Sequence, residues 1–111
     1  MTRAAMQQDW ERLSADILAR HPDVSPGRMM SHPALVHGGK VFAFLASNAG
    51  EGGLGLRLGR DMDPAALPAD RGPLAPFKTK PPLRDWVVLG PSTTALWPEL
   101  TETALRIARG R

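Results

Sequence analysis

The sequence predicts a two-layer α+β domain, in which a mainly antiparallel sheet carries its helices on one face. Apolar residues recur at helical spacing near both ends of the chain, two β-type runs flank the glycine pair 38–39, and a further run alternates leucine with glycine or arginine. The 111 residues match a single domain, 1–111, and the expected order of elements is α-β-β-β-α-β-β-α.

The first helix is predicted to end at His21. Thr2 suits its N-cap, and Pro22 ends it because the residue before a proline disfavours the helical conformation. His21 in the last turn suits the negative end of the helix dipole. Steps of four, three and four positions place four apolar residues on one helical face, which we expect to pack on a core: Met6, Trp10, Leu13 and Ile17.

The middle of the chain has the pattern of strands. Residues 28–30 are short and extended, and the runs 34–37 and 40–45 are joined by Gly38-Gly39. This pair predicts a tight hairpin, because glycine adopts the positive φ angles of such a turn without strain. In residues 54–58 leucines alternate with glycine and arginine, so one face of this strand is leucine and the other is nearly bare.

A short helix, two strands and a longer helix complete the predicted order. Asp63 resembles an N-cap followed by proline, which opens a short helix through Leu67. Residues 86–89 form the last clear strand. Residues 93–109 have a helical pattern that becomes regular near Pro98. Its apolar face consists of Trp97, Leu100, Ala104 and Ile107.

Two of the predicted strands are apolar on both faces. A sheet covered by helices on one side should alternate apolar and polar residues, yet 41–45 and 87–89 do not. We expect Trp86 and Phe42 or Phe44 to be core residues. The other apolar side chains either lie beneath the segment 71–82 or form an exposed patch, and such a patch predicts a homodimer.

No arrangement of residues is typical of catalysis. A strand follows the glycine-rich residues 50–55, whereas a phosphate loop needs a helix at that point. His32 and His37 match no zinc spacing and have no obvious third ligand, and capping explains Asp63. Neither a cysteine nucleophile nor a Gly-x-Ser-x-Gly elbow is present. We therefore expect a protein that is not an enzyme, with no cofactor, metal or small-molecule substrate.

Four basic residues are candidates for contact with nucleic acid or a partner. Lys78 and Lys80 share a face if their segment is extended, Arg84 follows closely, and Arg57 projects from the bare face of the leucine strand. A basic edge of this kind could follow the phosphates of DNA. A solvated polar face is the simpler interpretation, because the net charge is only +3.

Composition and patterning predict a cytoplasmic protein without membrane contact. The longest apolar run, 41–46, is far short of a membrane span, and the first residues lack the apolar segment of a secretory signal. The chain has no cysteine and therefore no disulfide. Its pI of 10.2 overstates its basicity, since arginine supplies all but three of the 14 basic residues.

Several of these segments follow one another as they do in a known family. They are 28–30, 37–45, 54–58, Pro76-Phe77, 84–88 and Trp97-Pro98-Glu99-Leu100 followed by Ala104. Over roughly residues 9–108 the chain resembles the TfoX/Sxy N-terminal domain family, with the MmcQ/YjbR-like family as a close second. The resemblance implies a secretion-chaperone-like α+β domain and no catalytic residue. TfoX/Sxy proteins are associated with the transcriptional regulation of competence genes, and MmcQ/YjbR-like proteins are often labelled DNA-binding.

These observations lead to two functional hypotheses. The first is a non-enzymatic regulatory or interaction domain that resembles the TfoX/Sxy N-terminal domain and acts beside DNA or a transcription regulator. The alternative is a dimeric peptide- or protein-binding module that does not contact nucleic acid. A salt titration separates them, because binding through phosphates weakens steeply as salt rises.

Overall fold

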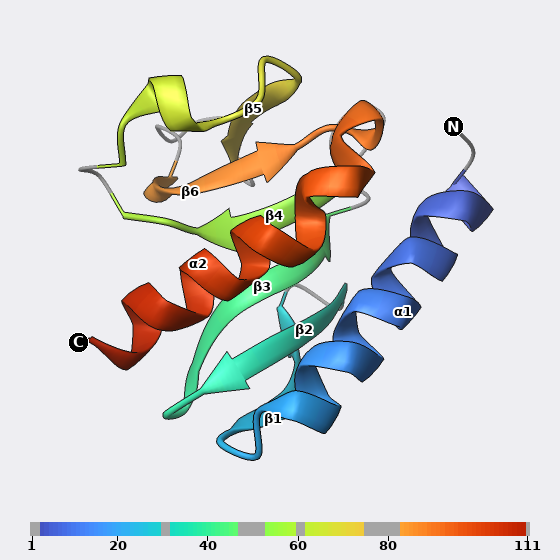
Figure 1. Cartoon of the computed structure of the whole chain (residues 1–111), viewed down its shortest axis with the longest axis vertical. Coiled ribbons are helices and arrows are strands. Elements are labelled where there is room, and N and C mark those ends of the chain that lie inside the picture. Colours follow the sequence, from blue (N-terminus) through green and yellow to red (C-terminus); the bar gives the residue numbers. More distant parts are fainter. Residues whose placement is uncertain (1–2, 30–31, 47–52, 60–61, 75–82, 111) are drawn as a thin grey trace.

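The computed structural model describes residues 3–29, 32–46, 53–59, 62–74 and 83–110. The elements in chain order are helix α1 (Arg3–Arg20), strands β1 (Val24–Met29), β2 (His32–His37), β3 (Lys40–Ala46) and β4 (Gly53–Arg57), 3₁₀ helix η1 (Pro64–Ala66), strands β5 (Arg71–Leu74) and β6 (Leu83–Leu89), 3₁₀ helix η2 (Pro91–Leu96) and helix α2 (Trp97–Arg109). Figure 1 shows their arrangement. The predicted α+β class and order of elements are confirmed.

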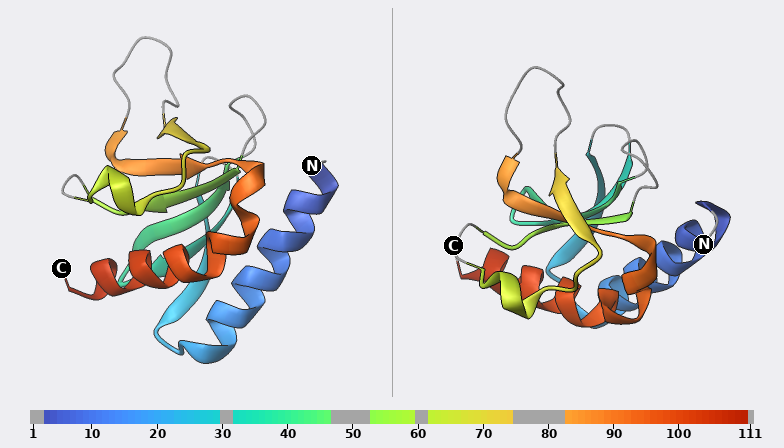
Figure 2. Two further views of the ribbon diagram at one scale, coloured as in Figure 1. Left: turned by 45° about the horizontal axis from the view of Figure 1, so that its top comes forward. Right: turned by 90° about the horizontal axis from the view of Figure 1, so that it is seen from above.

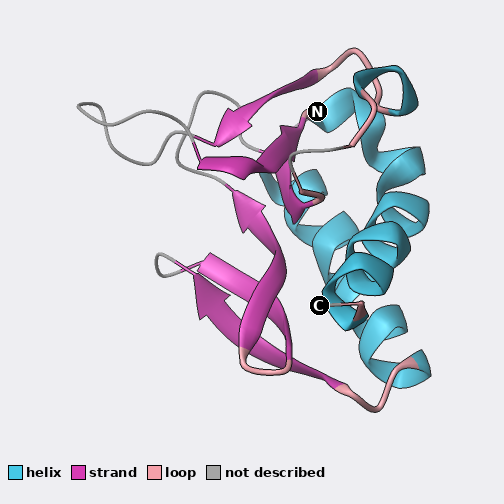
Figure 3. Cartoon of the chain, turned by 90° about the vertical axis from the view of Figure 1, so that its left-hand side faces the viewer, coloured by secondary structure: helices cyan, strands magenta, loops and turns pink. Residues whose placement is uncertain are grey.

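The strands form one antiparallel sheet of six, in the order β1-β2-β3-β4-β6-β5. Both long helices lie on the same side of this sheet, as the views in Figures 2 and 3 agree, so the two-layer arrangement is as predicted. The extended segment expected near Met29 belongs to a full edge strand, β1, which pairs with β2 along its whole length.

The larger hydrophobic core lies between the sheet and the two helices. α1 ends at Arg20, immediately before His21-Pro22, and its predicted apolar face is buried, with exposed fractions between 0% and 4%. The leucines of β4 face the same core, as their alternation predicted. The core residues contributed by α1, β4 and α2 include Met6, Trp10, Leu13, Ile17, Leu54, Leu56, Trp97, Ala104 and Leu105.

The glycine pair forms the predicted hairpin. Gly38 and Gly39 have φ angles of 58° and 79°, and His37 is paired directly with Lys40 across the turn. Both central residues of a two-residue turn of this type need positive φ, which a side chain would strain. The turn therefore sets the register of β2 against β3.

A β-bulge interrupts that register and explains why 41–45 is apolar throughout. Leu35 pairs with Ala43, but the next residue of β2 pairs with Val41, so Phe42 is an extra residue in β3. Phe42 and Ala43 both belong to the helix-side core, whereas Val41 packs on the opposite face. A bulge re-aims one side chain in this way, and the strict alternation expected of a flat strand does not apply.

A second apolar cluster lies on the sheet face away from the helices. Its centre is Phe44, which is 0% exposed and whose ring meets that of Trp86 edge-on at 5.4 Å. Gly55, on the bare face of β4, lies opposite Phe44 and makes room for its ring. The cluster comprises Ala34, Phe44, Ala46 and Leu74, with the partly buried Met29, Val41, Trp86 and Val88 around them.

This cluster bears on the two explanations for the apolar far face. Phe42 and Phe44 are core residues as predicted, and Trp86 is partly buried at the edge of the second cluster. Leu74, from the segment 71–82, is buried in that cluster, and residues 75–82 lie outside the described part. Among the described residues the exposed large hydrophobic side chain is Leu96, at 40%. Within the described residues the apolar side chains of this far face are therefore at least partly buried, and the dimer stays a prediction.

A capping hydrogen bond sets the start of η1, whereas η2 and α2 begin without a side-chain cap. Ala65 N donates to Asp63 Oδ1 at 3.0 Å, so the predicted short helix forms as the single turn η1. The predicted C-terminal helix divides into η2 and α2. Trp97 Nε1 donates to Thr93 Oγ1, which donates to the Gly90 carbonyl, so the buried indole is satisfied.

Candidate functional site: a cationic pocket and the polar network behind it

A partly enclosed pocket of about 290 Å³ lies at one end of the sheet. The β2–β3 hairpin, the last residue of β4 and the last turn of α2 form its walls, so segments far apart in the sequence meet there. Its lining residues are His37, Gly38, Lys40, Val41, Phe42, Arg57, Ile107 and Ala108. The volume is close to the lower end of the range for small-molecule sites, about 300–1,000 Å³.

Two cationic side chains line this pocket. Lys40 is exposed, and within the described ranges no hydrogen bond or ion pair involves its side chain. Arg57 is 30% exposed, and its Nη2 lies 3.7 Å from Asp85 Oδ2. That separation is longer than the about 2.7–2.9 Å of a charge-assisted hydrogen bond, so the ion pair is loose. Arg57 has five N–H donors and retains some of them for a ligand.

Apolar side chains supply part of the remaining lining. The bulge in β3 puts Phe42 toward the helix side while Val41 stays on the other face, and both line the pocket. Ile107 and Ala108 close it from α2. The bulge thus lets two consecutive residues of β3 line the pocket next to Lys40, and bulges are frequent next to functional sites.

Asp23, in the turn after α1, ties two walls of the pocket together. One of its carboxylate oxygens lies 3.1 Å from His37 Nε2, and Arg109 donates to both oxygens at 2.8 and 2.7 Å. His37 is a pocket residue, and Arg109 directly follows the pocket residue Ala108. The hydrogen bond from Arg109 is the main reason that the pKa of Asp23 is lowered, to about 2. Asp23 thus stays charged and holds the hairpin and α2 in fixed relation.

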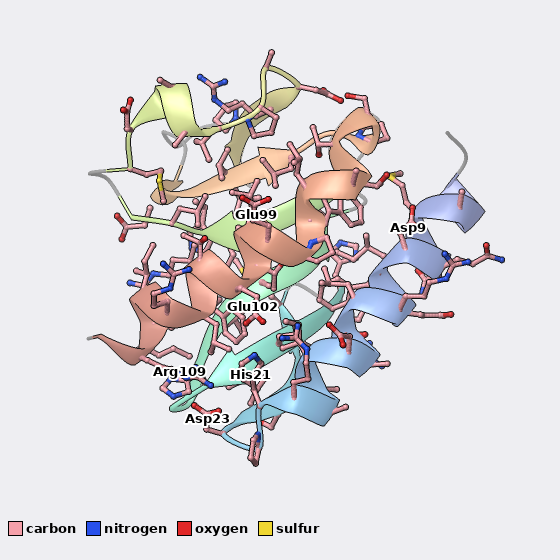
Figure 4. All side chains as sticks on the ribbon, in the orientation of Figure 1. Asp9, His21, Asp23, Glu99, Glu102 and Arg109 are labelled. Carbon is pink, nitrogen blue, oxygen red and sulfur yellow. The ribbon has the colours of Figure 1, made fainter. Side chains whose placement is uncertain are left out.

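His21 continues the network on the other side of Arg109, and its tautomer follows from its partners. Arg109 Nη2 lies 2.9 Å from His21 Nδ1, and because a guanidinium only donates, Nδ1 is the acceptor. Nε2 therefore carries the proton and donates to Glu102 Oε1 at 2.7 Å. Figure 4 shows His21, Asp23, Glu102 and Arg109 gathered between α2 and the turn after α1. Both ring nitrogens of His21 are occupied, which is a structural role.

Arg20 completes the network at the end of α1. It donates to Asp16 on its own helix and, at 2.6 Å, to Glu102 on α2. Its hydrogen bond to Asp16 is the main reason that the pKa of Asp16 is lowered. Glu102 therefore receives hydrogen bonds from both Arg20 and His21, and joins α1 to α2.

The structure places the four basic residues predicted from the sequence as follows. Arg57 ends β4 and lines the pocket. Arg84 lies in β6, two positions before Trp86, which pairs with Arg57, so Arg57 and Arg84 are on neighbouring strands at the same end of the sheet. Lys78 and Lys80 lie outside the described residues.

Sequence reasoning missed the pocket and its support. The hairpin itself carried a signal for Lys40, because a two-residue turn must place His37 and Lys40 opposite one another. No local pattern pointed to Asp23 or to the last turn of α2, since their contacts join residues 86 positions apart.

The two histidines considered for a metal site have different neighbours. His37 pairs with Asp23, whereas His32 lies near the Phe44 ring, with centroids 6.5 Å apart. In the part of the chain that the structure describes, no group of three or more potential ligands could hold a metal ion. Nor does any described helix have the length and apolar character needed to cross a membrane.

Comparison with known proteins adds no relative from which a function could be transferred. No family model, no curated protein and no solved structure matches this chain.

Proposed function

We propose that the protein is a non-enzymatic interaction domain of regulatory type, which recognises a negatively charged group of its partner at the cationic pocket. The observation that carries the proposal is the pairing of Lys40 and Arg57 in one hollow, where Lys40 has no counter-ion among the described residues. An anion that binds between these two cations is attracted by both, and the partial enclosure of the pocket strengthens that attraction relative to open water.

A binding role accounts for the polar network better than a catalytic one. A general acid or base needs a ring nitrogen or carboxylate that can reach a substrate. His21, Asp23 and Glu102 instead direct their polar atoms at one another and at Arg109. In this arrangement they support the walls of the pocket and leave the recognition of the anion to Lys40 and Arg57.

The test is an NMR titration of the full chain with sodium acetate and with inorganic phosphate. We expect saturable shifts in the backbone amides of Gly38, Phe42 and Ala108, and the Lys40→Met variant should remove them while keeping the apolar stem. Arg106→Met is the matched control, because Arg106 is an exposed cation of α2 that does not line the pocket. Amides that do not respond to either anion, or that respond equally in Lys40→Met, would contradict the proposal.

Contact with DNA is the second candidate, in line with the resemblance to the TfoX/Sxy family. The observation that favours it is the position of Arg57 and Arg84 on neighbouring strands at one end of the sheet. Fluorescence anisotropy with a labelled duplex would test it across a range of salt concentrations. If phosphates are contacted, the affinity should fall steeply with salt, and loss of one contact should reduce the slope by about one unit.

The dimeric binding module remains an alternative with a specific constraint. The two edge strands, β1 and β5, contain Pro26 and Pro73 near their middles. Proline has no N–H to donate, so these edges are poor templates for pairing with a second chain. A dimer would therefore have to form through side chains, and light scattering over a concentration series would detect it as a species heavier than 12.0 kDa.

A further inference from the structure

We propose that the ligand of the cationic pocket is a small organic acid with one carboxylate and a short aliphatic chain, an inference that rests on the proposed recognition of an anion by Lys40 and Arg57. Three properties of the pocket favour this class over other anions: its net charge, its apolar lining and the support of its walls.

The net charge of the pocket suits a single negative charge. Lys40 and Arg57 bring two positive charges to the pocket, and the carboxylate of Asp85, 3.7 Å from Arg57, lowers the positive potential there. Ile107 and Ala108 belong to the last turn of α2, where the helix dipole is negative. A dianion such as phosphate would meet this negative potential with more charge than the pocket can compensate. A monocarboxylate carries less charge against this negative potential and matches the planar donors of Arg57.

The lining opposite the cations suits an aliphatic chain. The side chains of Ile107 and Ala108 are partly buried and carry only carbon atoms, and Val41 and Phe42 also belong to the lining. An aliphatic chain placed against them leaves water, which favours binding in proportion to the apolar area that is buried. The sugars that flank a nucleic-acid phosphate would bring hydroxyl and ether oxygens against the same side chains, where nothing apolar would be gained.

The walls of the pocket are already held in place without a ligand. Asp23 is hydrogen-bonded to Arg109 beside the α2 wall and paired with His37 on the hairpin wall. The bulge and the turn angles of Gly38 and Gly39 set the position of Lys40 and Phe42. A preformed site binds a small ligand without the cost of ordering its own chain segments.

The test compares probes that differ in one property. NMR titrations of the full chain use sodium hexanoate, sodium acetate, which lacks the longer chain, n-hexanol, which lacks the charge, and inorganic phosphate. We expect hexanoate to shift the amides of Gly38, Phe42 and Ala108 saturably, and to bind about tenfold or more tightly than acetate or hexanol. Phosphate should bind more weakly than hexanoate.

Variants assign the effect to the pocket. Lys40→Met should weaken hexanoate about tenfold or more, whereas Arg106→Met, which removes the same charge outside the pocket, should leave the affinity within about twofold. A well-dispersed amide spectrum shows that each variant is folded. Arg57→Gln serves as a second pocket variant and should also weaken hexanoate.

The outcomes separate the ligand class from the proposed function. If hexanoate binds no better than acetate and both need Lys40, anion recognition stands and the aliphatic acid is wrong. The aliphatic acid is also wrong, and anion recognition stands, if phosphate binds the pocket amides more tightly than hexanoate. If hexanol binds as tightly as hexanoate, or if Lys40→Met binds hexanoate as tightly as the parent does, the pocket does not recognise the negative charge and both proposals fail. Amides that respond to no probe overturn both as well.

Discussion

Replacing Gly55 by alanine should destabilise the fold, although the new side chain is only a methyl group. A Cβ at Gly55 would lie 2.3 Å from Cε1 and 2.7 Å from Cδ1 of Phe44, whereas ordinary contacts begin near 3.4 Å. The ring would have to retreat by about 1 Å. Phe44 is fully buried and meets Trp86 edge-on, so it has little space for that movement. Overpacking of this kind costs about 1–3 kcal/mol.

The measurement is urea unfolding of the parent and variants, with free energies extrapolated to water and slopes compared. Gly72→Ala is the matched control: Gly72 also lies in a strand, its φ is not positive, and no atom lies within 4 Å of the new Cβ. That change should be neutral or should stabilise the protein by up to about 1 kcal/mol, because alanine restricts the unfolded chain.

A double-mutant cycle identifies the clash as the cause. Phe44→Leu removes the ring and should itself cost about 1–2 kcal/mol. Gly55→Ala in that background should then cost less than in the parent, with a coupling of about 1 kcal/mol. Gly55→Ala as stable as the parent, or strictly additive costs in the cycle, would refute the packing of Phe44 on Gly55.

Three further predictions follow from single observations. Thr101 is fully buried and its hydroxyl has no hydrogen-bond partner among the described residues, so Thr101→Val should raise the free energy of unfolding by about 1 kcal/mol, and a loss of stability in urea unfolding would contradict this. Trp86→Ala should cost less than the about 3–5 kcal/mol expected for Trp97→Ala, because Trp86 is only partly buried and Trp97 is 1% exposed; equal costs would contradict this. The folded-state pKa of Asp23 is about 2, below the about 3.9 of an unfolded aspartate, so its stabilising contribution is present above about pH 4 and is lost as the pH falls toward 2. Asp23→Asn should make the stability less dependent on pH in that window, and an unchanged acid profile would refute this role.

The extent to which the sequence predicted the fold follows from how local each signal is. The buried face of α1, the Gly38-Gly39 turn and the leucine face of β4 depend on residues within a few positions of one another. Helical spacing, positive φ at glycine and strand alternation are all properties of short segments. These elements, and with them the two-layer class, could therefore be predicted.

What the sequence could not determine depends on contacts between distant segments. The bulge at Phe42 arises from the pairing of β3 with β2. The bare face of β4 at Gly55 makes room for the ring of Phe44, which comes from the neighbouring strand. The cationic pocket forms because the hairpin and the last turn of α2 meet, held by Asp23 and Arg109 across 86 positions of sequence. Local propensity carries no information about which distant segments pack together, so the bulge in β3, the second apolar cluster and the pocket were decided by the tertiary structure.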